Sequence, residues 1–480
     1  MGALVAGIDC STQSTTVVVV DADGGAIVAR GQAPHVVTGD GGARLSDPEG
    51  WWAALAAALG QTGRAGDVAA VAVGGQQHGL LALDGAGVPL APAALWNDTT
   101  SAPDAAALVD DLGGRAAWAG LVGSVPPASF TVAKWAHLRR TQPALAAAAA
   151  AVRLPHDFLT ERLCGRAVTD RGDASGTGWW SPAAGDYADR VLALERVRLD
   201  RALLPEVLTG ASVAGTLTQR ASTALGLPAG ILVAAGTGDN MAAAVGLGLE
   251  PGTPVLSLGT SGTAYAVSER PAADASGILA GFADAGERFL PLACTLNATL
   301  AIDRVAAWLG IDREAVEPAG EVVVLPYLDG ERTPDLPHAA GTITGLRHTT
   351  SAGQILQAAY DGALESLLAG LDALEAATGA LDPAAPLVLV GGGARGTAWR
   401  ASAARLSGRD VEIPEETDSV ALGAAALAAA ALEGTADGAA VARGWDTRRG
   451  TRIAAPARDD ARLERMRSVR ARAAELNAAG

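Results

Sequence analysis

ILVAAGTGDNMAAAVGLG, residues 231–248 of the chain, passes from an apolar run through a glycine turn into a helix of small residues. Residues 231–235 predict a buried strand, and Gly236 and Gly238 allow a sharp turn. Asp239 supplies one carboxylate where the strand gives way to the helix. Open α/β sheets place their chemistry at the carboxyl ends of strands. Asp239 is therefore the first candidate for a catalytic residue, and an ordinary helix N-cap is the alternative interpretation.

The composition limits the size, class and partners of the protein. A chain of 480 residues, 49% of them hydrophobic, exceeds what one core supports, which predicts two domains. The net charge of -16 argues against a nucleic-acid partner, because a phosphate backbone requires a basic face. The sequence predicts neither a membrane span nor a secretory signal. Three widely spaced cysteines are typical of a cytoplasmic protein without disulfides.

Cationic side chains for holding a phosphate are scarce in this chain. Lys134 is the only lysine in the sequence. Any phosphate would therefore be held by arginine, by backbone N–H groups or by a metal ion.

Two stretches share one pattern of strand, polar turn and strand. In the first, residues 4–9 and 17–20 read as strands around a turn of small hydroxyl residues, and residues 253–266 repeat this pattern. In such a turn the backbone N–H groups of Ser11, Thr12 and Gln13 can point at an anion, and Asp9 beside them can hold magnesium. An ordinary hairpin is the alternative for each turn alone. The repetition predicts two related domains whose turns face one nucleotide.

Polar groups follow other predicted strands. Gln77 and His78 stand in GGQQHG after the strand at residues 68–73, and these side chains suit a polyhydroxylated ligand. Trp96, next to an amide and a carboxylate, is typical of a sugar pocket. The triple glycine at residues 391–393 precedes a helix and offers bare backbone to a nucleotide. The polar segment 170–178 is predicted to connect two elements, with a ligand-covering loop as the alternative.

The order of these motifs resembles the FGGY-type carbohydrate kinases, and it is most similar to the bacterial members that phosphorylate xylulose. The resemblance extends over essentially the whole chain and is carried by GIDCSTQST, DPEGWW, GGQQHG, LWND, GTGDN, LSLGTSG, GERTP and GGGAR. It implies an α/β fold of two actin-like, ribonuclease-H-like domains with a ligand cleft between them. Residues 1–245 would form the sugar-binding N-terminal domain, and residues 246–480 the ATP-binding C-terminal domain.

The resemblance also implies an activity, namely phosphoryl transfer from ATP to the 5-hydroxyl of D-xylulose. ATP and Mg²⁺ are the implied nucleotide and metal, and a small sugar is the implied partner. A homodimer is an assembly compatible with the resemblance.

Roles of individual residues follow from the matched motifs. Asp239 falls on the catalytic base and Asp9 on the acid that organises magnesium. The remaining matched positions are sugar contacts at Gln77, His78 and Asn240, and nucleotide contacts at Gly259, Thr260, Gly392, Gly393 and Ala394.

The chain departs from the family pattern at three positions. Thr16 stands where many members carry a basic residue, which predicts that backbone amides, magnesium or an arginine from elsewhere holds the phosphate on that side. Gln77 stands where some members have methionine, and His156 where lysine is frequent. The sugar preference could therefore differ from the family norm.

Two alternatives to xylulose phosphorylation stay open. One is a kinase of the same fold for another pentulose, polyol or aldonate, such as ribulose, glycerol or gluconate. The other is a catalytically silent, nucleotide-gated binding protein on the same scaffold.

Overall fold

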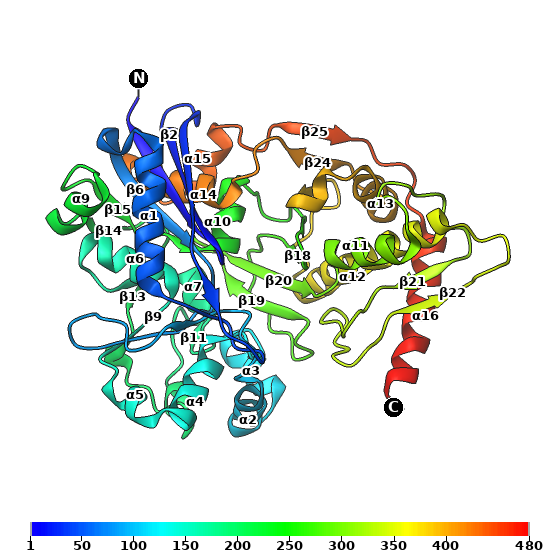
Figure 1. Ribbon diagram of the computed structural model, residues 1–480, viewed down its shortest axis with the longest axis horizontal. Coiled ribbons are helices and arrows are strands. Elements are labelled where there is room, and N and C mark those ends of the chain that lie inside the picture. The colour runs from blue at the N-terminus through cyan, green and yellow to red at the C-terminus, as the bar shows by residue number, and fades with distance from the viewer. Residues whose placement is uncertain (1, 479–480) are drawn as a thin grey trace.

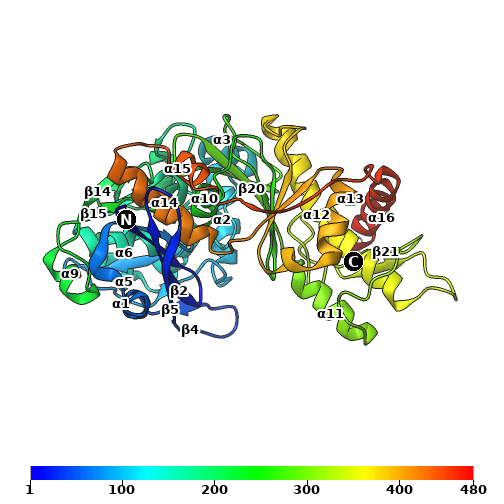
Figure 2. The same cartoon turned by 90° about the horizontal axis from the view of Figure 1, so that it is seen from above.

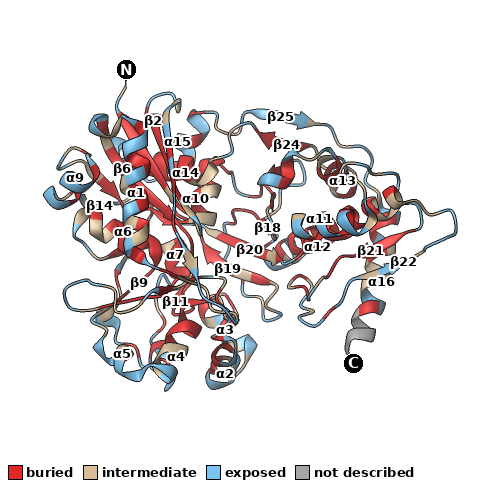
Figure 3. Ribbon diagram, in the orientation of Figure 1, coloured by how far each residue is buried: buried red, intermediate tan, exposed pale blue. Residues whose placement is uncertain are grey.

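The computed structural model describes residues 2–478 and contains two α/β domains that lie side by side (Figures 1 and 2). Each domain is built around a mixed seven-stranded sheet. The strands are largely buried, whereas helices on the outside, such as α1 (Pro48–Thr62), show one exposed face (Figure 3). The predicted fold class is confirmed.

The sheet of the first domain has the order β14-β15-β6-β1-β2-β3, and β16 continues alongside β6. Its central strand β1 pairs with β2 in antiparallel and with β6 in parallel orientation. Valine and alanine are the commonest residues of these central strands, which are almost entirely buried, as is typical of strands covered on both faces. The strands are β1 (Leu4–Cys10), β2 (Ser14–Asp21), β3 (Ile27–Pro34), β6 (Val68–Gly75), β14 (Val213–Thr216), β15 (Leu232–Ala234) and β16 (Thr237–Gly238).

The sheet of the second domain repeats this topology. Its order is β19-β20-β18-β17-β23-β24-β25. Here β17 pairs with β18 in antiparallel and with β23 in parallel orientation, as β1 does with β2 and β6. The repetition agrees with the predicted internal duplication. The strands are β17 (Val255–Leu258), β18 (Gly262–Tyr265), β19 (Leu279–Ala283), β20 (Phe289–Thr295), β23 (Leu387–Val390), β24 (Val411–Pro414) and β25 (Gly450–Ile453).

Helices cover both faces of the sheets. In the first domain they include α2 (Ala102–Leu112), α3 (Arg115–Val122), α4 (Thr131–Thr141), α6 (Pro155–Cys164), α7 (Arg171–Ser175), α9 (Gln219–Leu225) and α10 (Asp239–Gly246). In the second half of the chain they include α11 (Thr299–Leu309), α12 (Ala352–Thr378), α13 (Thr397–Ser407), α14 (Ser419–Glu433), α15 (Gly438–Gly444) and α16 (Asp460–Ala478).

Helix α14 belongs to the second half of the sequence but packs on the first domain. It contacts α10, β1 and β6, and Figure 1 shows it in orange among the elements of that domain. The contact is close, because a Cβ atom on Gly7 would lie 1.9 Å from the carbonyl oxygen of Ala421. The domain boundary between residues 245 and 246 therefore separates the two sheets, but it does not separate all the elements that pack on them.

No single helix within residues 2–478 has both the length and the apolar character needed to cross a bilayer. Among the described helices, α14 and α15 together have that length and apolar composition, but they are bent by 105° at their junction.

Candidate active site

Three parallel strands of the first sheet end at the same level. The register pairs Asp9 on β1 with Gly74 on β6, and Gly74 with Thr237 on β16. The residues that follow these strands therefore gather at one edge of the sheet, where α/β proteins bind their ligands. The structure thus brings together Asp9, Gln77, His78 and Asp239, as the sequence predicted.

Asp239 is the first residue of α10 and not its N-cap. The N-cap is Gly238, which makes no side-chain capping bond, so the alternative interpretation of Asp239 is wrong. Its Oδ1 atom accepts hydrogen bonds from Asn240, from the backbone nitrogen at 2.8 Å and from Nδ2 at 3.0 Å. Part of the residue remains accessible from the surface.

The environment of Asp239 makes its carboxyl group a strong enough base for proton transfer near neutral pH. Burial, together with the negative charges of Asp9 and Asp173, raises the pKa of Asp239 to about 7. A general base works best when its pKa lies near the operating pH. Burial raises the pKa of Tyr265 and of Cys294, which both belong to the second domain, and the charge of Asp239 acts in the same direction. Asp239 therefore lies where the two domains meet.

The two glycines before Asp239 are needed for different reasons. Gly236 has a φ of +74°, and a Cβ atom there would lie 2.2 Å from the carbonyl oxygen of Val73. Gly238 has an ordinary φ of -64°, so the turn requires a left-handed backbone only at Gly236. Its hydrogen leaves room for Gln77, whose Cγ atom would lie 2.6 Å from an added Cβ.

Gln77, Asn240 and His78 provide fixed polar atoms beside Asp239. Nδ2 of Asn240 donates to Oε1 of Gln77 at 3.0 Å as well as to Asp239. His78 has a φ of +65°, a strained conformation for this residue type that is frequent at functional sites.

The state of the His78 ring follows from its surroundings. Burial, together with the charges of Lys134 and Arg332, lowers the pKa of His78 to about 3, so the ring is neutral at pH 7. Nδ1 lies 2.7 Å from the carbonyl oxygen of Gly176, which can only accept, so Nδ1 carries the hydrogen. Nε2 is therefore a hydrogen-bond acceptor.

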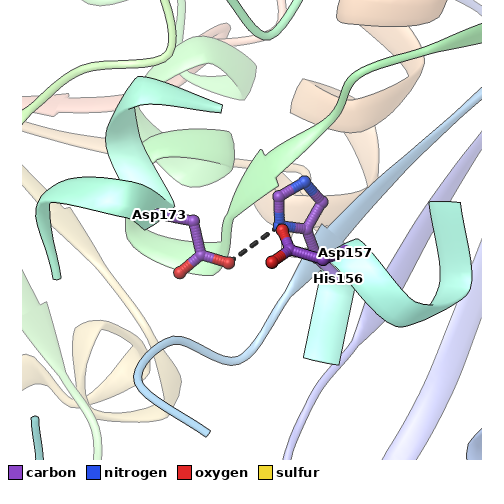
Figure 4. A group of neighbouring side chains, drawn as sticks. All are labelled: His156, Asp157 and Asp173. Atoms are coloured by element: carbon purple, nitrogen blue, oxygen red, sulfur yellow. Dashed lines mark hydrogen bonds and ion pairs between the residues drawn. The ribbon is translucent and has the colours of Figure 1, made fainter. Parts of the chain in front are cut away.

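A buried cluster of charged groups packs against the end of β6, where a Cβ atom on Gly75 would lie 2.7 Å from Cβ of His156. Figure 4 shows the side chains of this cluster. His156 on α6 lies between Asp173 and the main chain of β15. Its Nδ1 is 2.8 Å from Oδ2 of Asp173, and its Nε2 is 3.0 Å from the carbonyl oxygen of Ala235. Oδ1 of Asp157 lies 3.3 Å from the same Nδ1. Despite its burial, these carboxylates raise the pKa of His156 to about 9, so the ring is a cation at neutral pH.

His156, Asp157 and Asp173 lie close enough together to hold a metal ion. Both ring nitrogens of His156, however, donate hydrogen bonds. A histidine binds a metal through a ring nitrogen that carries no hydrogen. The cluster is therefore an ion-pair network.

Segment 170–178 is part of the site and not a simple connector, contrary to the sequence-based prediction. It contains the short helix α7, in which Asp173 is buried, and Gly176 binds the ring of His78. Sequence reasoning also missed Phe130 and Phe282, whose rings lie 4.8 Å and 5.6 Å from that of His78. Two aspartates among small residues, in DRGDASG, were the only available signal for the buried segment.

The first polar turn holds Asp9 beside Ser11, whose Oγ donates to Oδ1 of Asp9 at 2.6 Å. The N–H of Ser11 is bonded to the carbonyl oxygen of Ser14 at 3.0 Å, so the prediction that it faces an anion is wrong. Among the hydrogen bonds of the described residues, none uses the N–H groups of Thr12 and Gln13. These two groups remain available to an anion.

Trp96 lies at the accessible side of this turn. Its side chain is 40% exposed, and Nε1 donates to Oγ1 of Thr12 at 3.0 Å. Thr16 accepts a hydrogen bond from Nε2 of Gln32 at 3.2 Å. An amide therefore occupies the place next to Thr16, and the turn itself carries no basic side chain.

The second polar turn is fixed to the start of α11. The carbonyl oxygen of Gly259 accepts from Oγ1 of Thr299 at 2.8 Å, and that of Thr260 accepts from the N–H of Ala298 at 3.3 Å. These bonds hold the turn of Gly259 and Thr260 at the edge of the second sheet.

The triple glycine forms the start of a short 3-10 helix, η3 (Gly392–Arg395), with Gly391 as its N-cap. A Cβ atom on Gly392 would meet nothing within 4 Å, so its backbone is open to a ligand. Gly393 instead packs against Leu258 and Thr299, and the side chain of Ala394 is buried. Gly392 thus suits a nucleotide contact, while Gly393 and Ala394 shape the surface beneath it.

Two domains of one topology, with a basic carboxylate and fixed polar atoms where they meet, define an actin-like phosphotransferase. Comparison with known families is more specific. The model of the FGGY family of carbohydrate kinases, N-terminal domain, matches residues 4–246, and that of the C-terminal domain matches residues 255–432. The chain belongs to this family.

Individual relatives match over nearly the whole chain. A xylulose kinase of Streptomyces coelicolor is 60% identical over 476 residues, which are 99% of this chain and 97% of the relative. A xylulose kinase of Streptomyces rubiginosus is 58% identical over the same shares of the two chains. The crystal structure of xylulose kinase from Bifidobacterium adolescentis superposes with a TM-score of 0.86 at 36% identity, covering 98% of this chain and 99% of that one. The family and the enzyme class predicted from the sequence are confirmed.

Proposed function

We propose that this carbohydrate kinase transfers the γ-phosphoryl group of ATP to the 5-hydroxyl of D-xylulose and releases ADP and D-xylulose 5-phosphate. The identity of 60% to a xylulose kinase over 99% of the chain supports this substrate. The observation that carries the mechanism is the carboxylate of Asp239, whose pKa is raised to about 7 where the two domains meet.

In this reaction Asp239 takes the proton from the 5-hydroxyl of the sugar. The hydroxyl oxygen forms a bond to the γ-phosphorus, and the bond from that phosphorus to the bridging oxygen breaks. The bridging oxygen leaves with the electron pair as part of ADP. Such a reaction depends on positioning and charge stabilisation, which two closing domains supply while they exclude water.

The sugar contacts are proposed from the polar atoms beside Asp239. Nε2 of His78 can accept a hydrogen bond from a sugar hydroxyl, because Nδ1 carries the hydrogen of the ring. Gln77 is fixed beside Asp239 by the hydrogen bond that its Oε1 accepts from Nδ2 of Asn240 at 3.0 Å. Trp96, which is partly exposed next to the first turn, offers a flat apolar surface.

Asp9 fits the requirements of a magnesium ligand. Burial raises its pKa to about 6, and the nearby charge of Asp418 acts in the same direction, so a divalent cation would relieve the repulsion between the two carboxylates. Mg²⁺ prefers one or two carboxylates together with water and substrate phosphates. When bound, it would neutralise charge on the triphosphate. We propose that ATP lies between the two polar turns, with Gly392 offering its open backbone to the nucleoside.

A coupled assay of ADP formation tests the substrate. D-xylulose, D-ribulose, D-gluconate and glycerol would be compared at equal concentrations, with Asp239→Asn as the blank. The expected result is the highest kcat/KM for D-xylulose. A higher kcat/KM for another acceptor would show that D-xylulose is not the preferred substrate, while the proposed mechanism would still apply. Absence of ADP formation with every acceptor would favour the silent binding protein.

A further inference from the structure

Transfer of a phosphoryl group requires positive charge near the oxygens of the γ-phosphate. The first polar turn supplies none, because residues 10–16 contain no basic side chain. A basic side chain that assists magnesium on this side would have to come from another part of the chain.

Two basic residues near the site are already occupied. Lys134 is buried on α4, and its Nζ donates to the carbonyl oxygens of Ala128 and Ser129. Arg30 on β3 forms ion pairs with Glu416 at 2.7 Å and with Asp418 at 2.5 Å. Neither side chain is available to a ligand without loss of these bonds.

Arg332 differs from both. Its guanidinium takes part in none of the ion pairs of the described residues, its side chain contacts the neutral thiol of Cys294, and the residue is half-buried. The turn that carries it is nevertheless rigidly held. The buried carboxylate of Glu331 accepts from the N–H groups of Leu296 at 2.6 Å and of Arg332 at 2.8 Å. Oγ1 of Thr333 donates to the carbonyl oxygen of Cys294 at 2.7 Å.

These bonds place Arg332 at the edge of the second sheet that carries the polar turn. Cys294 and Thr295 end β20, and Thr295 pairs with Gly262, the residue that follows the turn. The same sheet reaches the sugar side, because Phe282 on β19, the strand next to β20, has its ring 5.6 Å from that of His78. Burial is the main cause of the lowered pKa of His78, and the charge of Arg332 acts in the same direction. Burial raises the pKa of the Cys294 thiol. The charge of Asp239 adds to this rise, whereas that of Arg332 opposes it.

We propose that Arg332 binds the γ-phosphoryl group of ATP during transfer and supplies the positive charge that the first turn lacks. This inference rests on the proposed function, since it assigns a residue to the phosphoryl group of that reaction. A guanidinium presents two parallel N–H donors to two phosphate oxygens, which lysine cannot do. The guanidinium of Arg332 has no carboxylate partner among the described residues, and hydrogen bonds hold the turn that carries it in place. Both properties suit this role.

Four variants test the proposal. Arg332→Gln should lower kcat about 100-fold, the usual effect of removing one donor to a charge that develops in the transition state. Arg332→Lys keeps the charge but lacks the two parallel N–H donors, so its kcat should lie between those of Arg332→Gln and the wild type. Arg347→Gln is the matched control, because Arg347 is an exposed arginine in the same part of the chain, and it should leave kcat unchanged. Added guanidinium ions should partly restore kcat in Arg332→Ala and leave the wild type unaffected.

Nucleotide binding separates a phosphate contact from a structural role. Titration calorimetry of Arg332→Gln should show a larger loss of affinity for ATP than for ADP, with an unchanged melting temperature. Equal losses for the two nucleotides, or a kcat within threefold of the wild type, would overturn the proposal. The calorimetry needs no sugar, so a wrong sugar assignment in the wild-type assay would not be mistaken for a failure of this inference.

Discussion

Asn240 binds the carboxylate of Asp239 through two hydrogen bonds, and both fall on the same oxygen, Oδ1. In the proposed reaction, the second oxygen, Oδ2, takes the proton of the substrate hydroxyl. Because Nδ2 of Asn240 also donates to Gln77, the amides of the sugar side fix the orientation of the base.

Replacement of the base should separate binding from chemistry. Asp239→Asn keeps the shape and a hydrogen-bonding group but cannot take a proton, so kcat should fall about 1000-fold. Binding of D-xylulose, measured by calorimetry, should change little. Asp110→Asn, an exposed position on α2, serves as the control with wild-type turnover. Near-normal turnover in Asp239→Asn would reject the assignment of the base.

The activity should depend on pH through the same residue. Protonated Asp239 cannot act as a base, and its pKa is raised to about 7 by burial and by Asp9 and Asp173. We expect kcat/KM to fall about tenfold per pH unit below pH 7 and to level off above it. A profile measured at low sugar concentration that stays flat down to pH 5 would contradict this assignment.

Asp239 should also lower the free energy of unfolding at high pH. Its folded-state pKa lies above the ordinary value of 3.8, so the folded protein binds more protons than the unfolded chain between pH 4 and pH 7. Stability contributed by this group therefore falls as the pH rises through that window. Asp239→Asn should be more stable than the wild type by about 1–2 kcal/mol at pH 8, with no gain at pH 4. Urea unfolding at both pH values measures the difference, and an equal gain at both would exclude this cause.

The charge of His156 should matter more than its ring. His156→Gln leaves Asp157 and Asp173 without their buried cation and should lose about 3–5 kcal/mol of unfolding free energy at pH 7. His156→Lys keeps the charge and should retain most of the stability. The pKa of His156 is raised to about 9, so its stabilising contribution is complete below pH 6.5 and lost as the pH rises through 9. Similar stability of the two variants at pH 7 would show that the charge is not required.

The contact between α10 and α14 depends on glycine. A Cβ atom on Gly423 would lie 1.8 Å from the carbonyl oxygen of Ala242, so the two helices would have to separate. Gly423→Ala should destabilise the protein by about 1–3 kcal/mol. Gly120→Ala, at an open position inside α3, should be neutral or stabilising by up to about 1 kcal/mol. Thermal unfolding compares the two variants, and equal melting temperatures would show that the helices can adjust.

Much of the fold and part of the site were predictable from local patterns. The strand and turn around Asp239 and the two polar turns are each encoded within fewer than twenty consecutive residues. Strand periodicity and glycine turns act over that distance, so they can be read without knowledge of the rest of the chain. The placement of Gln77 and His78 beside Asp239 followed, because parallel strands end at a common edge.

The sequence by itself determined the two-domain fold and the identity of the candidate base. The tertiary structure alone decided that α14 packs on the first domain, that segment 170–178 is buried in the site, and that Arg332 lies near His78. It also set the basicity of Asp239, because Asp9 and Asp173 meet it only in the folded chain. Burial and charge act through space between residues distant in sequence, and no local pattern of residues records those distances.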